Sequence, residues 1–286
     1  MKLRLLGATL AAITVLGCSV TGGAPAAPST SAPAVTSPSE ASSASGRGVP
    51  VELTVYGAAS LAGVLDAAKA AFETANPGLK LMISTDSSAA LEMKIEQGAP
   101  ADVFLAADTT NPKKLVDRGF ASGDAVEFAG NELAIIVPKG NSAKISTPAD
   151  LARSGVKVIA AGDEVPITKY AKQLVANLAK VSGYPSDFAA AYDRNVASKE
   201  DNVKAVVAKV GLGEGDAGIV YATDAKASRD VDTLAIPEGA NVPVTYAGVV
   251  VKASPNTDAA TAFLDWLTGP DGQAILKQSG FLPPPE

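Results

Sequence analysis

The 286-residue chain has no histidine, a single cysteine and few aromatic residues, which make up 5% of it. Without histidine there is no Ser–His or Cys–His pair to activate a nucleophile. One cysteine permits neither an internal disulfide nor a cysteine-rich metal site. The sequence also has no HExxH, P-loop or dinucleotide-binding motif. We therefore expect no enzyme, no cofactor and no cation ligands.

Basic residues are in the minority, with 24 Lys and Arg against 30 Asp and Glu. Residues 1–48 hold three of the bases and one of the acids, so the remainder has 21 bases and 29 acids, a net charge of −8. Nucleic-acid binding requires a basic face, so nucleic acid is excluded as a partner. A small anion stays possible if local dipoles, instead of net charge, bind it.

The first residues have the features of an export signal. Lys2 and Arg4 precede an apolar run over residues 5–16, which is too short for a membrane span of about 20 residues. The run ends in Val15-Leu16-Gly17-Cys18, which resembles the bacterial lipobox, where the cysteine is lipidated after cleavage. The alternative is an ordinary signal peptide with an incidental cysteine. We expect a signal peptide over 1–17, lipidation of Cys18, and an extracytoplasmic lipoprotein anchored to the cell membrane.

Residues 18–48 carry the predicted lipidated cysteine and are otherwise almost wholly Ser, Ala, Pro, Thr and Gly. The stretch has one acid, one base and no aromatic residue. It cannot bury enough apolar surface to offset the entropy lost on ordering. We expect a disordered tether between the membrane and a folded part that begins at residue 49.

The folded part alternates short β-rich runs with helical periodicity, which indicates an α/β fold with a largely parallel sheet covered on both faces. In such sheets ligands bind at the carboxyl ends of strands, near helix N-termini. Expected strands cover 51–56, 79–84, 102–106, 133–137, 156–160, 217–221 and 244–251. Expected helices cover 61–72, 87–98, 169–180, 202–210, 257–267 and 270–278.

Two serines stand where a predicted strand passes into a predicted helix. Ser60 follows the first strand and Ser88 the second, each in an N-cap position. A helix N-terminus offers unpaired N–H groups and the positive end of the dipole, so two such ends could hold an anion without a charged side chain. The alternative is that both serines only cap their helices.

Several motifs resemble periplasmic molybdate-binding proteins of molybdate ABC transporters. Residues 97–108 (QGAPADVFLAAD) are close to the family's GAPADVFLSAD segment, and they follow GAASL at 57–61 and SSAAL at 87–91. Further matches are GDEVPI at 162–167, EDNV at 200–203 and GIVY at 218–221. The resemblance extends to the Gly280-Phe281 tail, with every motif in order.

The resemblance implies a two-lobed periplasmic-binding-protein fold (type II) with two chain crossovers. Lobe 1 would hold residues 49–129 and 246–286, and lobe 2 residues 130–245. The ligand would be molybdate or tungstate, with molybdenum bound as an oxyanion in the cleft between the lobes. The partners would be this small oxyanion and an ABC transporter permease, and we expect a monomer.

Five positions match the family's anion ligands. Ser60 and Ser88 would each give a hydroxyl and a backbone N–H group, Ile167 and Val203 backbone N–H groups only, and Tyr221 its phenol. Without the resemblance, core packing explains the last three equally well.

Two residues depart from the family pattern. Thr168 stands where the family usually has glycine, so the loop needs a slightly different backbone path. Asp86 precedes Ser87 where a small residue is usual, and its carboxylate should point away from a bound dianion.

Neutral donors alone favour a fully deprotonated anion. Monohydrogen phosphate should be rejected because its proton would face a donor, and sulfate because it is too small to reach every donor. The main alternative is a binder of another tetrahedral oxyanion, sulfate or tungstate only, with the same fold. A purely structural surface lipoprotein is a third possibility.

Overall fold

The computed structural model describes residues 50–284. The predicted signal peptide, Cys18 and the tether lie outside these residues, so their assignments stay predictions. Within 50–284, no helix combines the length and the apolar composition that a membrane crossing requires.

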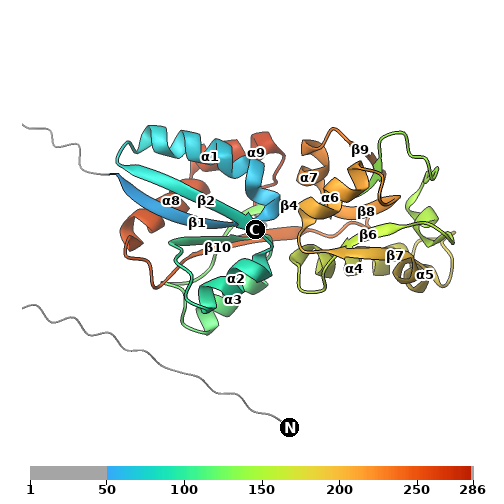
Figure 1. The fold of residues 1–286 in the computed structure, drawn as a ribbon, viewed down its shortest axis with the longest axis horizontal. Coiled ribbons are helices and arrows are strands. Elements are labelled where there is room, and N and C mark those ends of the chain that lie inside the picture. The colour runs from blue at the N-terminus through green and yellow to red at the C-terminus, as the bar shows by residue number, and fades with distance from the viewer. Residues whose placement is uncertain (1–49, 285–286) are drawn as a thin grey trace, which may run out of the picture. The chain divides into compact units, whose positions relative to one another are not determined.

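The described chain forms two five-stranded sheets that lie side by side (Figure 1). The first has the order β2-β1-β3-β10-β4 and the second the order β7-β6-β8-β5-β9. The first sheet consists of β1 (Val51–Ala58), β2 (Leu79–Asp86), β3 (Val103–Ala106), β4 (Val126–Asn131) and β10 (Val244–Val250). The second consists of β5 (Leu133–Pro138), β6 (Val158–Ala161), β7 (Val196–Glu200), β8 (Ala217–Tyr221) and β9 (Val231–Leu234).

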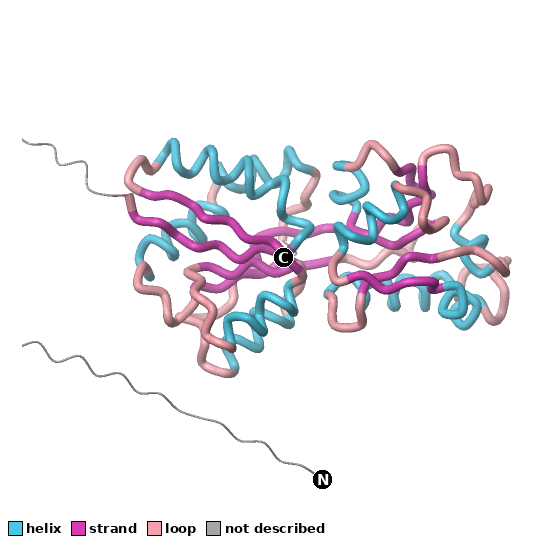
Figure 2. Tube along the Cα trace, viewed as in Figure 1, coloured by secondary structure: helices cyan, strands magenta, loops and turns pink. Residues whose placement is uncertain are grey.

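Each sheet is covered by its own helices, which lie outside the strands in Figure 2. The first sheet contacts α1 (Ala62–Ala75), α2 (Ser88–Glu96), α3 (Thr110–Asp117), α8 (Thr257–Thr268) and α9 (Pro270–Ser279). The second contacts α4 (Pro166–Leu178), α5 (Phe188–Asn195), α6 (Val203–Gly211) and α7 (Ala222–Ala227). Two 3-10 helices, η1 (Ala59–Leu61) and η2 (Pro148–Ala152), complete the elements. The expected α/β class is confirmed.

The chain passes between the sheets twice. It leaves the first sheet at Asn131 and enters the second at Leu133, then returns between Leu234 and Val244. These are the two crossovers expected from the sequence. On this basis we propose lobe boundaries near residues 130 and 245.

The expectation of largely parallel strands is wrong. β1 runs parallel to β2 and β3, and β6 runs parallel to β7 and β8. However, β10 is antiparallel to β3 and β4, and β5 is antiparallel to β8 and β9. The chain leaves the first sheet along β4 and returns along β10, so these two neighbours necessarily run in opposite directions. No helix intervenes there to turn the chain around.

Aromatic residues pack where the crossover strands meet the site. Tyr246 of β10 is fully buried, and its ring makes edge contacts with Phe128 of β4 and with Phe281. Tyr221, the last residue of β8, has its ring centroid 5.6 Å from that of Tyr246. These large rings bury apolar surface where the two sheets meet.

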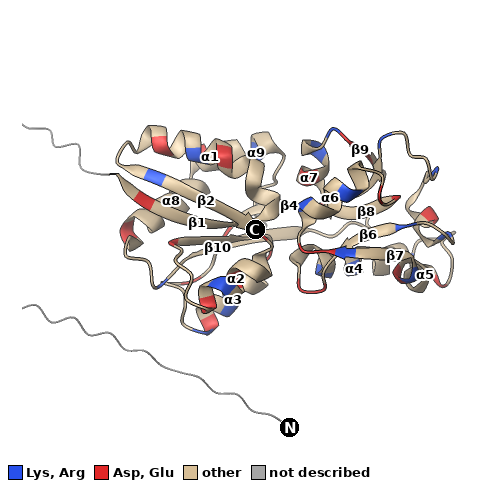
Figure 3. Ribbon diagram, viewed as in Figure 1, with Lys and Arg blue, Asp and Glu red and all other residues tan. Residues whose placement is uncertain are grey.

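Charged residues of both signs occur on both halves of the described chain (Figure 3). Many are paired on the surface, such as Lys113 with Asp117 at 2.7 Å within α3. Exposed pairs of this kind contribute little stability. By sequence, residues 49–129 and 246–286 hold 8 bases and 15 acids, whereas residues 130–245 hold 13 bases and 14 acids, so most of the net negative charge belongs to the first half.

Candidate functional site

Ser60 lies at the end of the first strand, in the middle of η1, and is 6% exposed. Its hydroxyl is 3.0 Å from the hydroxyl of Tyr246. The expectation that Ser60 occupies an N-cap is wrong, because η1 leads directly into α1 and the serine makes no capping bond. The side chain instead faces β10, which leaves its hydroxyl available for another role.

Ser88 is the first residue of α2 and is 1% exposed. The cap of this helix is its neighbour Ser87, whose hydroxyl oxygen accepts a hydrogen bond from the Ala90 N–H at 3.2 Å. The expected capping position of Ser88 is therefore wrong by one residue. Its hydroxyl oxygen instead accepts a hydrogen bond from the main-chain N–H of Ala107, at 3.0 Å.

Tyr221 connects the two serines to each other. Its hydroxyl donates to the carbonyl oxygen of Ala107 at 3.4 Å, a long bond, and its ring lies against Tyr246. Ala107 thus contacts both Ser88 and Tyr221, while Tyr246 contacts both Tyr221 and Ser60. The structure brings together these three predicted site residues from η1, α2 and β8.

Ile167 and Val203 lie at the starts of two helices that cover the second sheet. Ile167 follows Pro166, the first residue of α4, and Val203 is the first residue of α6, which Asn202 caps by accepting from Ala205 N–H at 3.1 Å. Their side chains are 1% and 3% exposed and belong to the hydrophobic core. Only their main-chain N–H groups, which a helix start leaves without intrahelical partners, could therefore face a ligand.

The starts of both helices lie near the serine side of the site. Helix α6 contacts η1, which carries Ser60. In the first turn of α4, Tyr170 accepts a hydrogen bond from the backbone of Thr245 at the crossover and feels the charge of Asp108. Burial is the main reason that the pKa of Tyr170 rises to about 12. Helix N-termini from the second half thus approach the ends of β1 and β3.

A cavity of about 250 Å³ lies between η1, α6, α7 and α9. Ser60 lines it from the first half, and Lys204, Thr223 and Asp224 line it from the second. The cavity is large enough for a small tetrahedral anion, but of the five predicted site residues only Ser60 lines it.

An ion pair in this wall, between a buried acid and a partly exposed lysine, was not predicted from the sequence. Asp224 is 2% exposed, and among the described residues neither of its carboxylate oxygens has a hydrogen-bond partner. Lys204 Nζ lies 3.4 Å from Oδ1, an ionic contact without hydrogen-bond geometry. Burial raises the pKa of Asp224 to about 6, against the opposing effect of Lys204. An acid in the first turn of a helix is common, so the sequence does not signal that this one is buried.

A second buried acid follows β3. Asp108 is 5% exposed and accepts hydrogen bonds from the backbone and side chain of Asn111, at 3.1 and 2.9 Å. Burial raises the pKa of Asp108 in spite of these bonds. Its carboxylate therefore serves to cap the turn before α3.

The two departures from the family pattern have local explanations. Asp86 accepts from the N–H of Ser87 at 2.8 Å and pairs with Lys94 at 3.0 Å, so its charge is engaged on the outer side of α2. Thr168 donates to the carbonyl oxygens of Ala161 and Gly162, at 3.1 and 2.7 Å. Its side chain thus fastens the start of α4 to the end of β6, where glycine would make no such bond.

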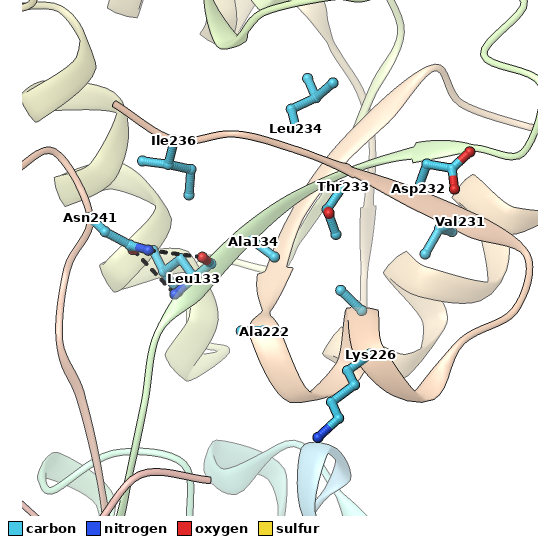
Figure 4. A pocket seen from close by; sticks show the side chains of 11 residues that line it. Leu133, Ala134, Ala222, Lys226, Val231, Asp232, Thr233, Leu234, Ile236 and Asn241 are labelled. Atoms are coloured by element: carbon cyan, nitrogen blue, oxygen red, sulfur yellow. Dashed lines mark hydrogen bonds between the residues drawn. The ribbon is translucent and has the colours of Figure 1, made fainter. Parts of the chain in front are cut away.

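A more open cavity, of about 560 Å³, lies between β5, β9 and α7 (Figure 4). Asn241 there bonds to both main-chain groups of Leu133, at 3.2 and 3.0 Å, and Lys226 points away from the other labelled side chains. None of the five predicted site residues lines it. Over residues 50–284, no group of three or more His, Cys, Asp or Glu is arranged to hold a metal ion.

A sequence profile of bacterial extracellular solute-binding proteins matches residues 53–282. Molybdate-binding protein ModA of Mycobacterium tuberculosis is 32% identical over 233 residues, which are 81% of this chain and 85% of that protein. A putative ABC transporter substrate-binding lipoprotein of Bacillus subtilis, YvgL, is 30% identical over 81% of this chain and 86% of its own length.

Two solved structures share the architecture. The periplasmic molybdate-binding protein of Azotobacter vinelandii superposes with a TM-score of 0.69 at 25% identity, covering 82% of this chain and all of that one. The sulfate-binding protein SubI of Mycobacterium tuberculosis gives 0.72 at 23% identity, over 81% and 86% of the two chains, a likeness of fold alone. The expected two-lobed periplasmic-binding-protein fold is thereby confirmed. The chain belongs to the bacterial extracellular solute-binding protein family, in which it is a relative of the ModA proteins.

Proposed function

We propose that the protein captures molybdate, and tungstate as an equivalent ligand, between its two halves and delivers it to an ABC importer. The relatives named for molybdate support the ligand class. The observation that carries the proposal is that Ser60, Ser88 and Tyr221 lie close together: Ala107 bonds to both Ser88 and Tyr221, and Tyr246 contacts the Tyr221 ring and the Ser60 hydroxyl.

The hydrogen bond at Ser88 favours donation to an anion. A serine hydroxyl has one proton to donate and oxygen lone pairs that accept. At Ser88 the oxygen already accepts from the N–H of Ala107, so its own proton is left for a ligand. Together with N–H groups at the helix starts, such neutral donors make charge-assisted bonds worth about 1.5–3 kcal/mol each. Several of them offset the cost of removing a dianion from water.

Selectivity follows from the same set of groups. A site built from donors has no acceptor for the proton of monohydrogen phosphate, so this anion would bind with one unfavourable contact. Sulfate has the right charge but is smaller, so it would not reach every donor at once. Tungstate matches molybdate in size and charge and should bind similarly.

Delivery would use the two-part architecture. Ser60 and Ser88 belong to elements of the first sheet, and Ile167, Val203 and Tyr221 to elements of the second. An anion held by both groups would favour the closed arrangement of a hinge formed by the two crossovers. A closed, loaded protein is the form that a permease would recognise. The lipobox at Cys18 would keep it at the membrane surface.

Thermal-shift screening of the purified protein with oxyanions tests the proposal. A ligand that binds the folded state raises the melting temperature by mass action. We expect molybdate and tungstate to raise it and phosphate to leave it nearly unchanged. Equal stabilisation by phosphate would contradict the donor-only site.

Sulfate is the alternative ligand, because the sulfate-binding protein SubI has the same fold. If sulfate stabilised the protein more than molybdate did at equal concentration, the protein would be a sulfate binder. Stabilisation by tungstate alone would identify it as a tungstate-specific protein. If none of these anions had an effect, a structural surface lipoprotein would become the better assignment.

A further inference from the structure

We infer that Asn131 and Tyr246 are positioning residues that force the Ser60 hydroxyl to act as a donor toward the bound anion. The inference rests on the proposed function and deepens it, because it names the groups that make the site selective. It concerns two residues that are more than 100 positions apart in the sequence and meet at the crossover between the halves.

The orientation of the Asn131 amide is determined by its neighbours. Its Oδ1 accepts a hydrogen bond from the main-chain N–H of Glu132 at 2.9 Å. A main-chain N–H group can only donate, so this side of the amide must be the oxygen. The Nδ2 group therefore faces the other way, where it donates to the hydroxyl of Thr223 at 2.9 Å and to that of Tyr246 at 3.3 Å.

The hydroxyl oxygen of Tyr246 therefore already accepts one hydrogen bond, and the hydroxyl proton needs an acceptor of its own. It is fully buried, and aromatic rings of Phe128, Tyr221 and Phe281 surround it. Burial raises the pKa of Tyr246, so the phenol keeps its proton. The Ser60 oxygen, 3.0 Å away, is the acceptor at hand. Donation from Ser60 to Tyr246 instead would leave the phenol proton buried without a partner, which is unfavourable.

The hydrogen bonds therefore run in one direction: Asn131 donates to Tyr246, and Tyr246 donates to Ser60. Because the Ser60 oxygen accepts from Tyr246, its own proton remains for the proposed anion. Ser88 is in the same state, since its oxygen accepts from the Ala107 N–H. Both serines then present protons, and neither offers a lone pair to a protonated anion.

The Tyr246→Phe variant tests the inference, because it removes the donor to Ser60 and keeps the ring. The freed Ser60 hydroxyl can then rotate and accept a proton. By calorimetry at pH 7 we expect molybdate to bind about tenfold more weakly, because the Ser60 hydroxyl is no longer held in the orientation that donates to the anion. A tenfold change corresponds to about one hydrogen bond. We also expect the preference for molybdate over hydrogen phosphate to decrease by a similar factor.

A double-mutant cycle separates this role from a general loss of packing. In a Ser60→Ala background, Tyr246→Phe should have no further effect on molybdate affinity, because the oriented group is gone. Tyr184→Phe is the matched control: this tyrosine packs edge-on against Phe188 of α5, away from the proposed ligands, so the loss of its hydroxyl should leave affinity and selectivity unchanged. Melting of each unliganded variant confirms that it folds.

The outcomes distinguish the inference from the proposed function. If wild type binds molybdate and Tyr246→Phe keeps both its affinity and its selectivity, the inference is overturned and the proposed function stands. If the effects of Tyr246→Phe and Ser60→Ala simply add, Tyr246 does not act through Ser60 and the inference is again overturned. If wild type binds no oxyanion, the proposed function is overturned and the inference with it.

Discussion

In the proposed site, the hydroxyl groups of Ser60 and Ser88 would take the role that charged side chains have in many anion sites. Each serine oxygen is engaged within the protein, Ser60 with Tyr246 and Ser88 with Ala107. The protein environment thus prepares both protons for donation before a ligand arrives. A hydroxyl that is already oriented loses less conformational freedom when the ligand binds, which favours affinity.

Replacing either serine with alanine should weaken molybdate binding by about 10- to 150-fold, the equivalent of one charge-assisted hydrogen bond of roughly 1.5–3 kcal/mol. The backbone N–H group and the helix N-terminus remain in each variant. Titration calorimetry measures the loss. Ile167→Ala and Val203→Ala are the comparison, and they should cost much less because only the main chain is proposed to contact the anion.

The Ser88→Ala variant has a second expected effect. It leaves the buried N–H of Ala107 without an acceptor, which should lower the free energy of unfolding by about 1–3 kcal/mol. Chemical denaturation without ligand measures this effect separately. If both serine variants bound molybdate as tightly as wild type, the two hydroxyls would have only structural roles.

Asp224 should make stability depend on pH. Its pKa rises from 3.8 to about 6 in the folded state because it is buried, so the folded state holds a proton that the unfolded state loses. The free energy of unfolding therefore falls as the pH rises from about 4 to 6. Above that range Asp224 is ionised in both states, so its contribution no longer changes with pH. Asp224→Asn should raise the free energy of unfolding at pH 7 by up to about 3 kcal/mol relative to wild type.

The test is the difference in unfolding free energy between Asp224→Asn and wild type, measured from pH 3.5 to 7.5. The difference should widen as the pH rises between 4 and 6. A constant difference across this range would show that Asp224 does not titrate there. Lys204, which faces Asp224, is 40% exposed at its side chain and so keeps access to water in the variant.

At the residue scale, the sequence could supply only part of the site. The five proposed ligands came from a resemblance carried by short motifs around Ser60, Ser88 and Ile167. Asn131, Tyr246 and the burial of Asp224 were not predicted. Tyr246 is 186 residues from Ser60, and no local pattern signals a bond over that separation.

At the scale of elements, the site depends on how closely helices α8 and α9 pack. Gly272 in the first turn of α9 leaves no room for a side chain, because a β-carbon would lie 2.5 Å from the main-chain atoms of Leu267 and Trp266. Helix α9 in turn provides Gln278 and Ser279 to the wall of the cavity beside Ser60. The close approach of α9 to α8 at Gly272 therefore positions one wall of the cavity beside Ser60.

Gly272→Ala should lower the free energy of unfolding by about 1–3 kcal/mol, the usual cost of overpacking. Denaturant titration measures it. Gly63→Ala is the control, because a β-carbon there meets nothing within 4 Å and alanine favours the helix. If Gly272→Ala were as stable as wild type, α9 would be free to shift away from α8.

Most elements with clear hydrophobic patterning were predicted well, whatever their length. The expected helix at 257–267 corresponds to α8 (Thr257–Thr268), and the expected strand at 217–221 has the bounds of β8. Helices α3, α5 and α7 and strands β4, β7 and β9 were not predicted from the sequence. Strand β7 has no buried residue, so it shows no alternation of apolar and polar positions. Its place in the sheet depends on pairing with β6.

At the scale of the whole molecule, we expect anion binding and membrane attachment to depend on different parts of the chain. The described residues carry the two sheets and the proposed site, and the predicted lipobox at Cys18 lies outside them. Cys18→Ser should release the protein from membranes and leave anion binding unchanged, because the site does not involve the anchor. Fractionation of cells into membrane and soluble material measures the first effect, and calorimetry of the released protein the second.

An outcome against the anchor would be a Cys18→Ser protein that stays in the membrane fraction after its signal peptide is cleaved. The lipoprotein assignment would then be wrong, although the site would be unaffected. A Cys18→Ser protein that is released but no longer binds the anion would instead show that anion binding depends on the anchored N-terminus.

The overall division into two halves followed from resemblance, whereas the direction of the strands did not. Alternating strands and helices suggested largely parallel strands, but β5 and β10 run antiparallel to their neighbours because they carry the chain between the sheets. A crossover has no signature in hydrophobic periodicity. The chain at Glu132, between β4 and β5, reads as a short polar break between two apolar runs.

The most direct test is a crystal structure of the protein grown with molybdate, with anomalous scattering used to locate molybdenum. The account predicts one strong molybdenum peak between the two halves. Its oxygens should lie about 2.5–3.0 Å from the hydroxyl oxygens of Ser60, Ser88 and Tyr221. The main-chain nitrogens of Ile167 and Val203 should lie within about 3.2 Å of the same anion. A peak in the cavity beside Asn241, or no ordered molybdenum at all, would contradict the account.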